Sequence, residues 1–271
     1  MPSSSGEPSG LIRLKRTAMR PLSCLLFLVG ACMLTRAEPW ASQGDERFEN
    51  AETYQFTYGV YVFGVPVGIR AEMQSASAGT SYRLSSDLTH AFAQNHHVSL
   101  FRLEDCDYTP EGYHNHGRSP GWRFNDRVVF DVEGDEIHYE GATQRPGQKT
   151  ATDLALSFPW DDAVYVDKLS QFSVLGCYLA RGDREIFLSY VDDTVGRYRF
   201  TPEGKARPFK VGQRTLSGLP VRAVPVEFEE GSIHTPVRYW LSEELGYMPI
   251  KISTKLNGLR LSVRLLDTNC C

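Results

Sequence analysis

Large apolar residues recur at every second position over most of the chain. Two such runs flank Gly64-Val65-Pro66; they contain Tyr54, Phe56, Tyr58, Val60 and Val62, followed by Val67, Ile69, Ala71 and Met73. A second pair flanks Asn257-Gly258, a dipeptide typical of a type I′ turn; it contains Ile250 and Ile252, followed by Leu259, Leu261, Val263 and Leu265. A period of two places one side of each segment in a core, so both pairs predict β-hairpins.

Shorter runs with the same period fill much of the remaining sequence. They lie around residues 82–86, 128–139, 188–200 and 224–241, and the connections between them are short. Short connections favour antiparallel pairing, because a parallel crossover needs about a dozen residues and usually a helix. The stretch from Glu140 to Asp153 has almost no large apolar residue and predicts a loop that divides two sets of strands.

One segment near the middle has helical spacing instead. Three acids, Asp161, Asp162 and Asp167, precede a set of apolar residues that ends before Gly182, namely Leu169, Phe172, Leu175 and Cys177. Acids near the start of a helix suit its dipole. We therefore predict a mainly β fold: a large antiparallel sheet, strongly curved or closed into a barrel or half-barrel, with one or two helices packed against it.

The N-terminal segment predicts export. Basic residues precede an apolar run, Pro21 to Leu34, which is shorter than the roughly twenty residues that span a membrane. Small residues precede a candidate cleavage point after Ala37, as in a secretory signal. We expect residues 1–37 to be a signal peptide, with 1–18 as a mis-called start upstream of Met19. Residues 38–52 are then a linker and 53–271 a single β-rich domain.

An alternative reading of the same segment is a lipoprotein signal. Val29-Gly30-Ala31-Cys32 resembles a bacterial lipoprotein box, in which the cysteine is acylated and becomes the mature N-terminus. We therefore expect a periplasmic protein, with an outer-membrane lipoprotein attached through Cys32 as the alternative. Membrane contact is expected only if Cys32 is lipidated.

Composition and charge narrow the function classes. The chain has 271 residues and a formal net charge of −4. Residues 1–37 hold five of the 29 basic and one of the 33 acidic side chains, which leaves 24 basic against 32 acidic, or about −8, after cleavage. An acidic protein is a poor partner for nucleic acid, and its net charge argues against docking on anionic lipid through a basic patch.

Four cysteines remain outside the predicted signal: Cys106, Cys177, Cys270 and Cys271. An oxidising compartment would allow Cys106 to pair with Cys177, with Cys270 and Cys271 forming a vicinal bridge or pairing elsewhere. Spacing alone does not choose among the three connectivities. The CxxC spacing of a metal or redox site is absent from the sequence.

Neither the serine motif nor the histidines of the sequence support a catalytic assignment. Gly117-Arg118-Ser119-Pro120-Gly121 matches the pattern of a hydrolase nucleophile elbow, but Pro120 lacks the backbone N–H that the oxyanion would need. Histidines gather at His90, His96, His97, His114 and His116, and we interpret them as solvated loop and turn residues rather than metal ligands.

We also interpret three pairs of adjacent acids as turn residues: Asp161-Asp162, Asp192-Asp193 and Glu243-Glu244. We therefore assign no catalytic residue, no metal ligand and no cofactor. Ligand-binding residues are not identified by the sequence.

The aromatic residues suit a packed core, and also a hydrophobic cavity for a lipid or acyl chain at the mouth of a barrel. They are Tyr54, Phe56, Tyr58, Tyr61, Phe63, Phe92, Phe101, Trp122, Trp160 and Trp240.

Several short segments together carry a family resemblance. They are residues 58–68 (YGVYVFGVPVG), 127–131 (RVVFD), 167–172 (DKLSQF), 239–242 (YWLS) and 248–252 (MPIKI). In this order and spacing, from about Tyr54 to Leu266, the chain resembles the exported bacterial family known as domain of unknown function 3108. The resemblance implies a Gram-negative periplasmic or outer-membrane-facing protein, similar in architecture to the curved sheet and helix of lipoprotein carriers. It carries no catalytic residues.

Two functions follow from these observations. The first is a non-enzymatic binding or carrier protein of the cell envelope, whose partner is an apolar ligand such as a lipid, or another envelope protein. The second is an envelope enzyme acting on polysaccharide or peptidoglycan, which would need two converging carboxylates about 5 to 9.5 Å apart.

Overall fold

The sheet consists of two antiparallel runs of strands that meet where the first strand of the chain pairs with the last. The computed structural model describes residues 46–91, 93–119, 122–144, 150–191, 195–228, 235–256 and 258–270. Strand β1 (Glu52–Val62) lies against β16 (Leu259–Thr268), with Phe56 opposite Thr268 and Val62 opposite Leu261. This pairing joins the two runs into one continuous sheet.

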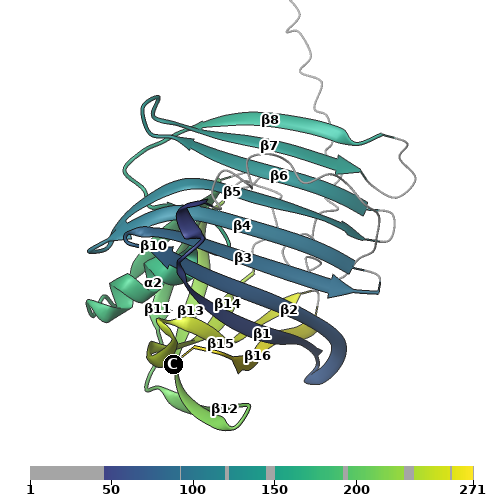
Figure 1. The fold of residues 1–271 in the computed structure, drawn as a ribbon, viewed down its shortest axis with the longest axis vertical. Helices are drawn as coiled ribbons and strands as arrows, with labels where there is room; N and C mark the ends of the chain where they lie inside the picture. Colours follow the sequence, from purple (N-terminus) through teal and green to yellow (C-terminus); the bar gives the residue numbers. More distant parts are fainter. Residues whose placement is uncertain are drawn as a thin grey trace, which may run out of the picture.

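The first run is a meander in which consecutive strands are neighbours, and the second is antiparallel from β10 to β16, with β11 paired to β13 (Figure 1). The first run continues from β1 through β2 (Val65–Ala78), β3 (Ser81–His90), β4 (Ala93–Glu104), β5 (Asp107–Ser119), β6 (Trp122–Asp131), β7 (Glu136–Gln144) and β8 (Thr152–Pro159). The second comprises β9 (Tyr165–Val166), β10 (Ile186–Val191), β11 (Val195–Pro202), β12 (Arg207–Val211), β13 (Arg214–Phe228), β14 (Val237–Ser242), β15 (Met248–Leu256) and β16. Strand β12 pairs only with β13. Short connections thus produce antiparallel pairing, as the sequence predicts.

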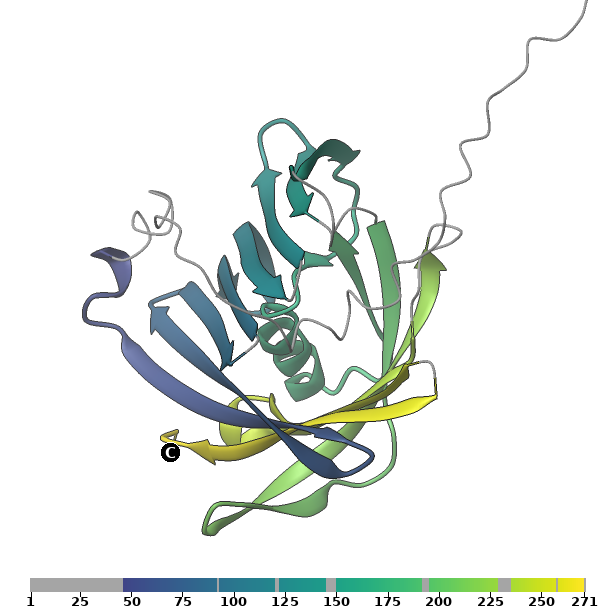
Figure 2. The same ribbon diagram turned by 90° about the vertical axis from the view of Figure 1, so that its right-hand side faces the viewer.

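Helix α2 (Gln171–Ala180) is the crossover between β9 and β10, which pair in parallel. It lies on the concave side of the sheet, with strands around it on several sides (Figure 2). Its Phe172, Leu175 and Leu179 are buried in the main hydrophobic core together with residues from both runs of strands, such as Phe101 and Leu241. The helix therefore fills the space that the curved sheet encloses.

The sheet stays open, but side chains bring its two ends together. A second cluster combines Ile137 and Tyr139 of β7 with Tyr165 of β9 and Val191 of β10. Trp160, between β8 and β9, packs edge-on against Phe130 at a ring-centroid distance of 5.6 Å. Hydrophobic packing at this seam takes the place of the backbone hydrogen bonds that would close a barrel.

These observations confirm the predicted mainly β fold, the curved antiparallel sheet and the central helix. Within the described residues α2 is the only α-helix, and η2 (Glu46–Phe48) and η3 (Glu243–Leu245) are short 3-10 turns. None of the helices in that part of the chain has the length and apolar character needed to cross a bilayer. The predicted signal peptide lies outside the described residues. Phe48, in the segment expected to be a linker, is buried against Val98 and Leu100.

The prediction of a dividing loop from Glu140 to Asp153 is wrong at both ends. Strand β7 extends to Gln144 and β8 begins at Thr152, and the two pair with each other from Glu136 opposite Pro159 to Thr143 opposite Thr152. The low apolar content reflects an edge of the sheet, since β8 alternates between exposed and half-buried positions.

Candidate functional site

The outward face of β13 to β16 carries the candidate site. On β14, Tyr239 points inward, and its ring packs edge-on against Phe172 of helix α2 with centroids 5.8 Å apart. Arg238 and Trp240 therefore point outward, because side chains alternate along a strand. Trp240 lies opposite Lys251 of β15, and Lys251 opposite Arg264 of β16. The pairing of three strands thus aligns cationic residues on the outer surface.

An open groove of about 680 Å³ lies over these strands. Six cationic side chains line it: Arg222, Arg238, Lys251, Lys255, Arg260 and Arg264. Its remaining lining is made of small polar and apolar residues, namely Ser253, Thr254, Ser262, Phe63, Gly64, Pro236, Val237 and Leu261. No acid lines the groove among the described residues. Its chemistry is that of a site for an anionic group with an apolar part.

Aromatic rings hold two of the cations in place. The Lys251 ammonium lies 4.4 Å from the ring centroid of Trp240, and the Arg264 guanidinium lies 4.3 Å from that of Tyr61. Such contacts restrain long cationic side chains without neutralising them. Lys251 and Arg264 therefore keep their charge available for a ligand in the groove.

Partial neutralisation comes from one acid beside the groove. Glu203 forms an ion pair with Arg238 at 2.7 Å and a longer one with Arg222 at 3.9 Å. One carboxylate between two guanidinium groups leaves this end of the groove positive. The same excess acts on Lys251, whose ammonium pKa is lowered by burial and, to a smaller extent, by the charge of Arg264. A bound anion would relieve this repulsion.

Comparison with known proteins shows a similarity of fold and assigns no function to the groove. No family model and no curated protein matches the chain. Among solved structures it is similar to a β-barrel-like protein of domain of unknown function 1849 from Brucella abortus, at 9% sequence identity and a TM-score of 0.52. The match covers 81% of this chain and 98% of that one. The fold is β-barrel-like.

A polar network surrounds the start of helix α2 and joins it to β4 and β5. The Asp167 carboxylate accepts hydrogen bonds from the backbone N–H groups of Leu169 and Ser170, at 2.7 and 2.9 Å, and so stabilises the turn that leads into the helix. It also accepts from the hydroxyls of Ser99 and Ser170, at 2.6 and 2.8 Å. Burial raises the pKa of this carboxyl, and these hydrogen bonds oppose the rise. Tyr108 extends the network by donating to Ser170.

The second buried acid in this part of the chain is also engaged. Asp126 accepts hydrogen bonds from the Tyr139 hydroxyl at 2.9 Å and from the Asn115 amide at 3.3 Å. Asp126 and Asp167 are thus built into the packing of the sheet and the helix. This arrangement suits a structural role better than the exposed, converging acids that glycoside hydrolysis requires.

The interpretation of the histidines as loop and turn residues is wrong for four of the five, although His116 is exposed to solvent as expected. His96 and His97 belong to β4, His114 and His116 to β5, and only His90 ends a strand at a turn. Strands accept these polar residues because neighbours on the sheet satisfy them: His114 is buried and hydrogen-bonds Asn125 at 2.6 Å.

Desolvation governs the titration of two of these rings. It is the main cause that lowers the pKa of His97 to about 3 and that of His116 to about 4. No three His, Cys, Asp or Glu side chains are grouped for metal binding within the described residues.

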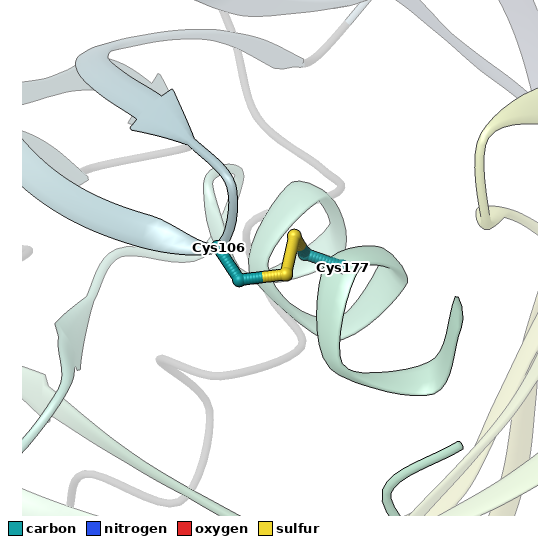
Figure 3. Close-up of a disulfide and its surroundings, with 2 residues drawn as sticks. All are labelled: Cys106 and Cys177. Atoms are coloured by element: carbon teal, nitrogen blue, oxygen red, sulfur yellow. A yellow bond between two sulfur atoms is a disulfide. The ribbon is translucent and has the colours of Figure 1, made fainter. Parts of the chain in front are cut away.

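The predicted pairing of Cys106 with Cys177 is confirmed. Cys106 lies in the turn between β4 and β5, Cys177 lies in helix α2, and their Cα atoms are 5.5 Å apart (Figure 3). Cys270 is buried, whereas Cys271 and the candidate lipidation site Cys32 lie outside the described residues. The disulfide fixes the helix to the first run of strands.

The remaining sequence candidates stay at turns or strand ends. Ser119 ends β5, and the turn that follows leads to β6 rather than to the helix of a nucleophile elbow. Asp161 and Asp162 lie between β8 and β9, and Glu243 and Glu244 form η3, whereas Asp192-Asp193 lies outside the described residues.

Sequence reasoning missed the groove, although its signal is visible. Cationic residues lie four positions apart in two of the strands, at Arg260 and Arg264 and at Lys251 and Lys255, and a further cation, Arg238, lies in a third. Read with a period of two, these positions fall on the face opposite the apolar residues of the same strands. What the sequence alone left open was the pairing that lays the three strands side by side.

Proposed function

We propose that the protein is a non-enzymatic binding protein of the bacterial cell envelope that holds an anionic amphiphile, such as an acidic lipid, by its head group in the cationic groove. The observation that carries this proposal is the collection of six cations in one groove of a chain whose net charge is negative. The hydroxyls of Ser253 and Ser262 add hydrogen-bond donors for phosphate or carboxylate oxygens.

The apolar part of the ligand is expected at the outer rim of the groove rather than inside the curved sheet. Helix α2 occupies the concave side, and its Leu175 is fully buried there. Phe63 and Leu261 in contrast line the groove. The apolar ligand expected from the sequence is therefore redefined as an amphiphile with a charged head group.

The cellular setting of this proposal rests on sequence. The apolar run ending near Ala37 and the resemblance to domain of unknown function 3108 support export to the periplasm, with lipidation at Cys32 as the alternative route to the outer membrane. The β-barrel-like fold is compatible with membership of that family. The enzyme alternative ranks second because Asp126 and Asp167 are already engaged in hydrogen bonds.

Titration calorimetry with soluble lipids tests the proposal. Dihexanoyl phosphatidylglycerol, below its micelle concentration, is expected to bind, and dihexanoyl phosphatidylcholine is expected to bind at least tenfold more weakly. Raising the salt concentration should weaken the binding of the anionic lipid, because the attraction is electrostatic.

A matched pair of variants separates local from global charge. Lys251→Gln with Lys255→Gln removes two groove cations, whereas Lys205→Gln with Lys210→Gln removes two exposed cations in and beside β12. Both pairs change the net charge equally. The first is expected to weaken binding of the anionic lipid at least tenfold and the second less than twofold. Equal effects of the two pairs would refute a specific site in the groove.

A further inference from the structure

Two hairpin tips beside the groove expose apolar side chains to solvent. Phe63 and Val65 at the turn between β1 and β2 are 60% and 64% exposed, and Leu259 at the start of β16 is 44% exposed. The tips are neighbours, because the Phe63 N–H donates to the Arg260 carbonyl at 2.8 Å and Val62 lies opposite Leu261. Together Phe63, Val65 and Leu259 form what we call the apolar rim.

The backbone conformation of the first tip is energetically unfavourable for a large residue such as Phe63. Phe63 has φ +50° and Gly64 has φ +85°, so both central residues of this two-residue turn lie in the left-handed region. Such a turn favours Asn or Asp followed by Gly. A large aromatic residue in a left-handed conformation that is also exposed points to a use for that side chain outside the folded core.

Cations surround the rim. Lys255 and Arg260 face each other across the β15–β16 hairpin, directly next to Leu259, and Arg264 lies further along β16. Exposed apolar side chains within a collar of Lys and Arg match the two layers of an acidic membrane surface: acyl chains below and negative head groups above. A neutral surface or an acidic peptide would use one of these features but not both.

We propose that the apolar rim inserts into the interfacial layer of an anionic lipid membrane and places the groove against the head groups. This inference rests on the proposed function, since it names the surface from which the groove takes its ligand. The negative net charge, from which the sequence argues against docking on anionic lipid, is a sum over the whole chain, whereas the groove beside the rim carries six cations. The acids on other faces are repelled by the same membrane and so orient the molecule. Docking of this kind does not depend on lipidation of Cys32.

Vesicle flotation tests the docking directly. The exported chain carrying Cys32→Ser, which prevents acylation and leaves the predicted cleavage after Ala37 to remove the basic and apolar leader, is mixed with vesicles of phosphatidylcholine alone or with one third phosphatidylglycerol. The protein is expected to float with the anionic vesicles and to stay behind with the neutral ones. Equal binding to both would overturn the role of the cationic collar.

Variants of the rim complete the experiment. Val65→Ser with Leu259→Ser changes two rim residues that do not line the groove. The matched control, Val132→Ser with Val226→Ser, changes two exposed valines elsewhere, one in the turn after β6 and one on β13. The rim pair is expected to weaken vesicle binding at least fivefold and to leave the affinity for soluble dihexanoyl phosphatidylglycerol unchanged. The control pair should alter neither.

The outcomes distinguish the two proposals. Vesicle binding by the rim variant equal to that of the parent, or equal loss in the control variant, would overturn the docking and leave the groove assignment standing. Absence of soluble-lipid binding together with rim-dependent vesicle binding would refute the proposed function of the groove and support docking through the rim.

Discussion

The hydroxyl of Ser99, on β4, donates a 2.6 Å hydrogen bond to the carboxylate of Asp167, which also holds the turn that leads into helix α2. The two residues are 68 positions apart in the sequence. One buried acid therefore both stabilises the turn before the helix and fixes it to the sheet. The helix in turn supports the inner side of the strands whose outer side carries the groove.

Removing this acid should destabilise the protein. Asp167→Ala leaves the Ser99 hydroxyl and the backbone N–H groups of Leu169 and Ser170 without their acceptor, so we expect a loss of about 3 kcal/mol in the free energy of unfolding. Asp167→Asn keeps one carbonyl oxygen as an acceptor for these N–H groups and should lose less. Urea denaturation followed by circular dichroism measures both, with Ser99→Ala, expected to cost about 1 kcal/mol, as the single-bond control. An Asp167→Ala variant as stable as the parent would contradict the anchoring role.

The disulfide should contribute independently of that network. Cys106 and Cys177 close a loop with a sequence separation of 71 residues, for which the chain-entropy treatment gives about 4 kcal/mol. Cys106→Ser with Cys177→Ser is therefore expected to lower the free energy of unfolding by roughly 2 to 4 kcal/mol. Reduction of the parent protein should reproduce the change, and reduction of the double variant should add little to it. A parent protein whose stability is insensitive to reductant would argue against this contribution.

Local patterns in the sequence were enough for the strands and the helix. The period of two in Phe56, Tyr58 and Val60 predicts a buried strand face, and all three side chains are buried. The helical spacing of Leu169, Phe172 and Leu175 after Asp167 predicts the helix, and Phe172 and Leu175 lie in α2. Such features depend on residues close in sequence and can be found without coordinates.

Features that depend on strand pairing were out of reach. The groove needs β13 to β16 to lie side by side, and the net charge of the chain averages its cations with acids on other faces. The histidines were misplaced for a similar reason: His114 can be buried because the side-chain oxygen of Asn125, on the neighbouring strand, accepts a hydrogen bond from its ring. Pairing register, not composition, decides both.

Acid should weaken the fold through His97. Its pKa is lowered from 6.5 to about 3 in the folded protein, so between these values the unfolded chain binds more protons than the folded one. Stability is therefore expected to fall as the pH drops below 6.5, by at most about 1.4 kcal/mol per pH unit from this group, with the loss complete near pH 3. Urea denaturation at pH 7, 5.5 and 4.5 measures the slope.

Two substitutions identify the group responsible for that slope. His97→Gln removes the titrating ring and is expected to flatten the dependence on pH. His116→Gln should flatten it less, because the pKa of His116 is lowered less, to about 4 against about 3 for His97. A parent-like slope in His97→Gln would assign the acid sensitivity to other groups.

Phe63→Asn should raise the stability of the protein and weaken its binding to lipid. Asn tolerates the left-handed φ of +50° at this position and precedes Gly64 as type I′ turns prefer, so we expect a gain of about 1 kcal/mol in the free energy of unfolding. The same change removes the aromatic wall of the groove and part of the apolar rim. Binding to soluble and vesicular phosphatidylglycerol is therefore expected to weaken. Thermal melts and calorimetry on one preparation measure the two effects. A residue retained for function at a strained position lowers stability while it improves binding. A less stable Phe63→Asn variant would therefore show that Phe63 is kept for packing. A variant that binds as the parent does would show that the Phe63 ring is not used for binding.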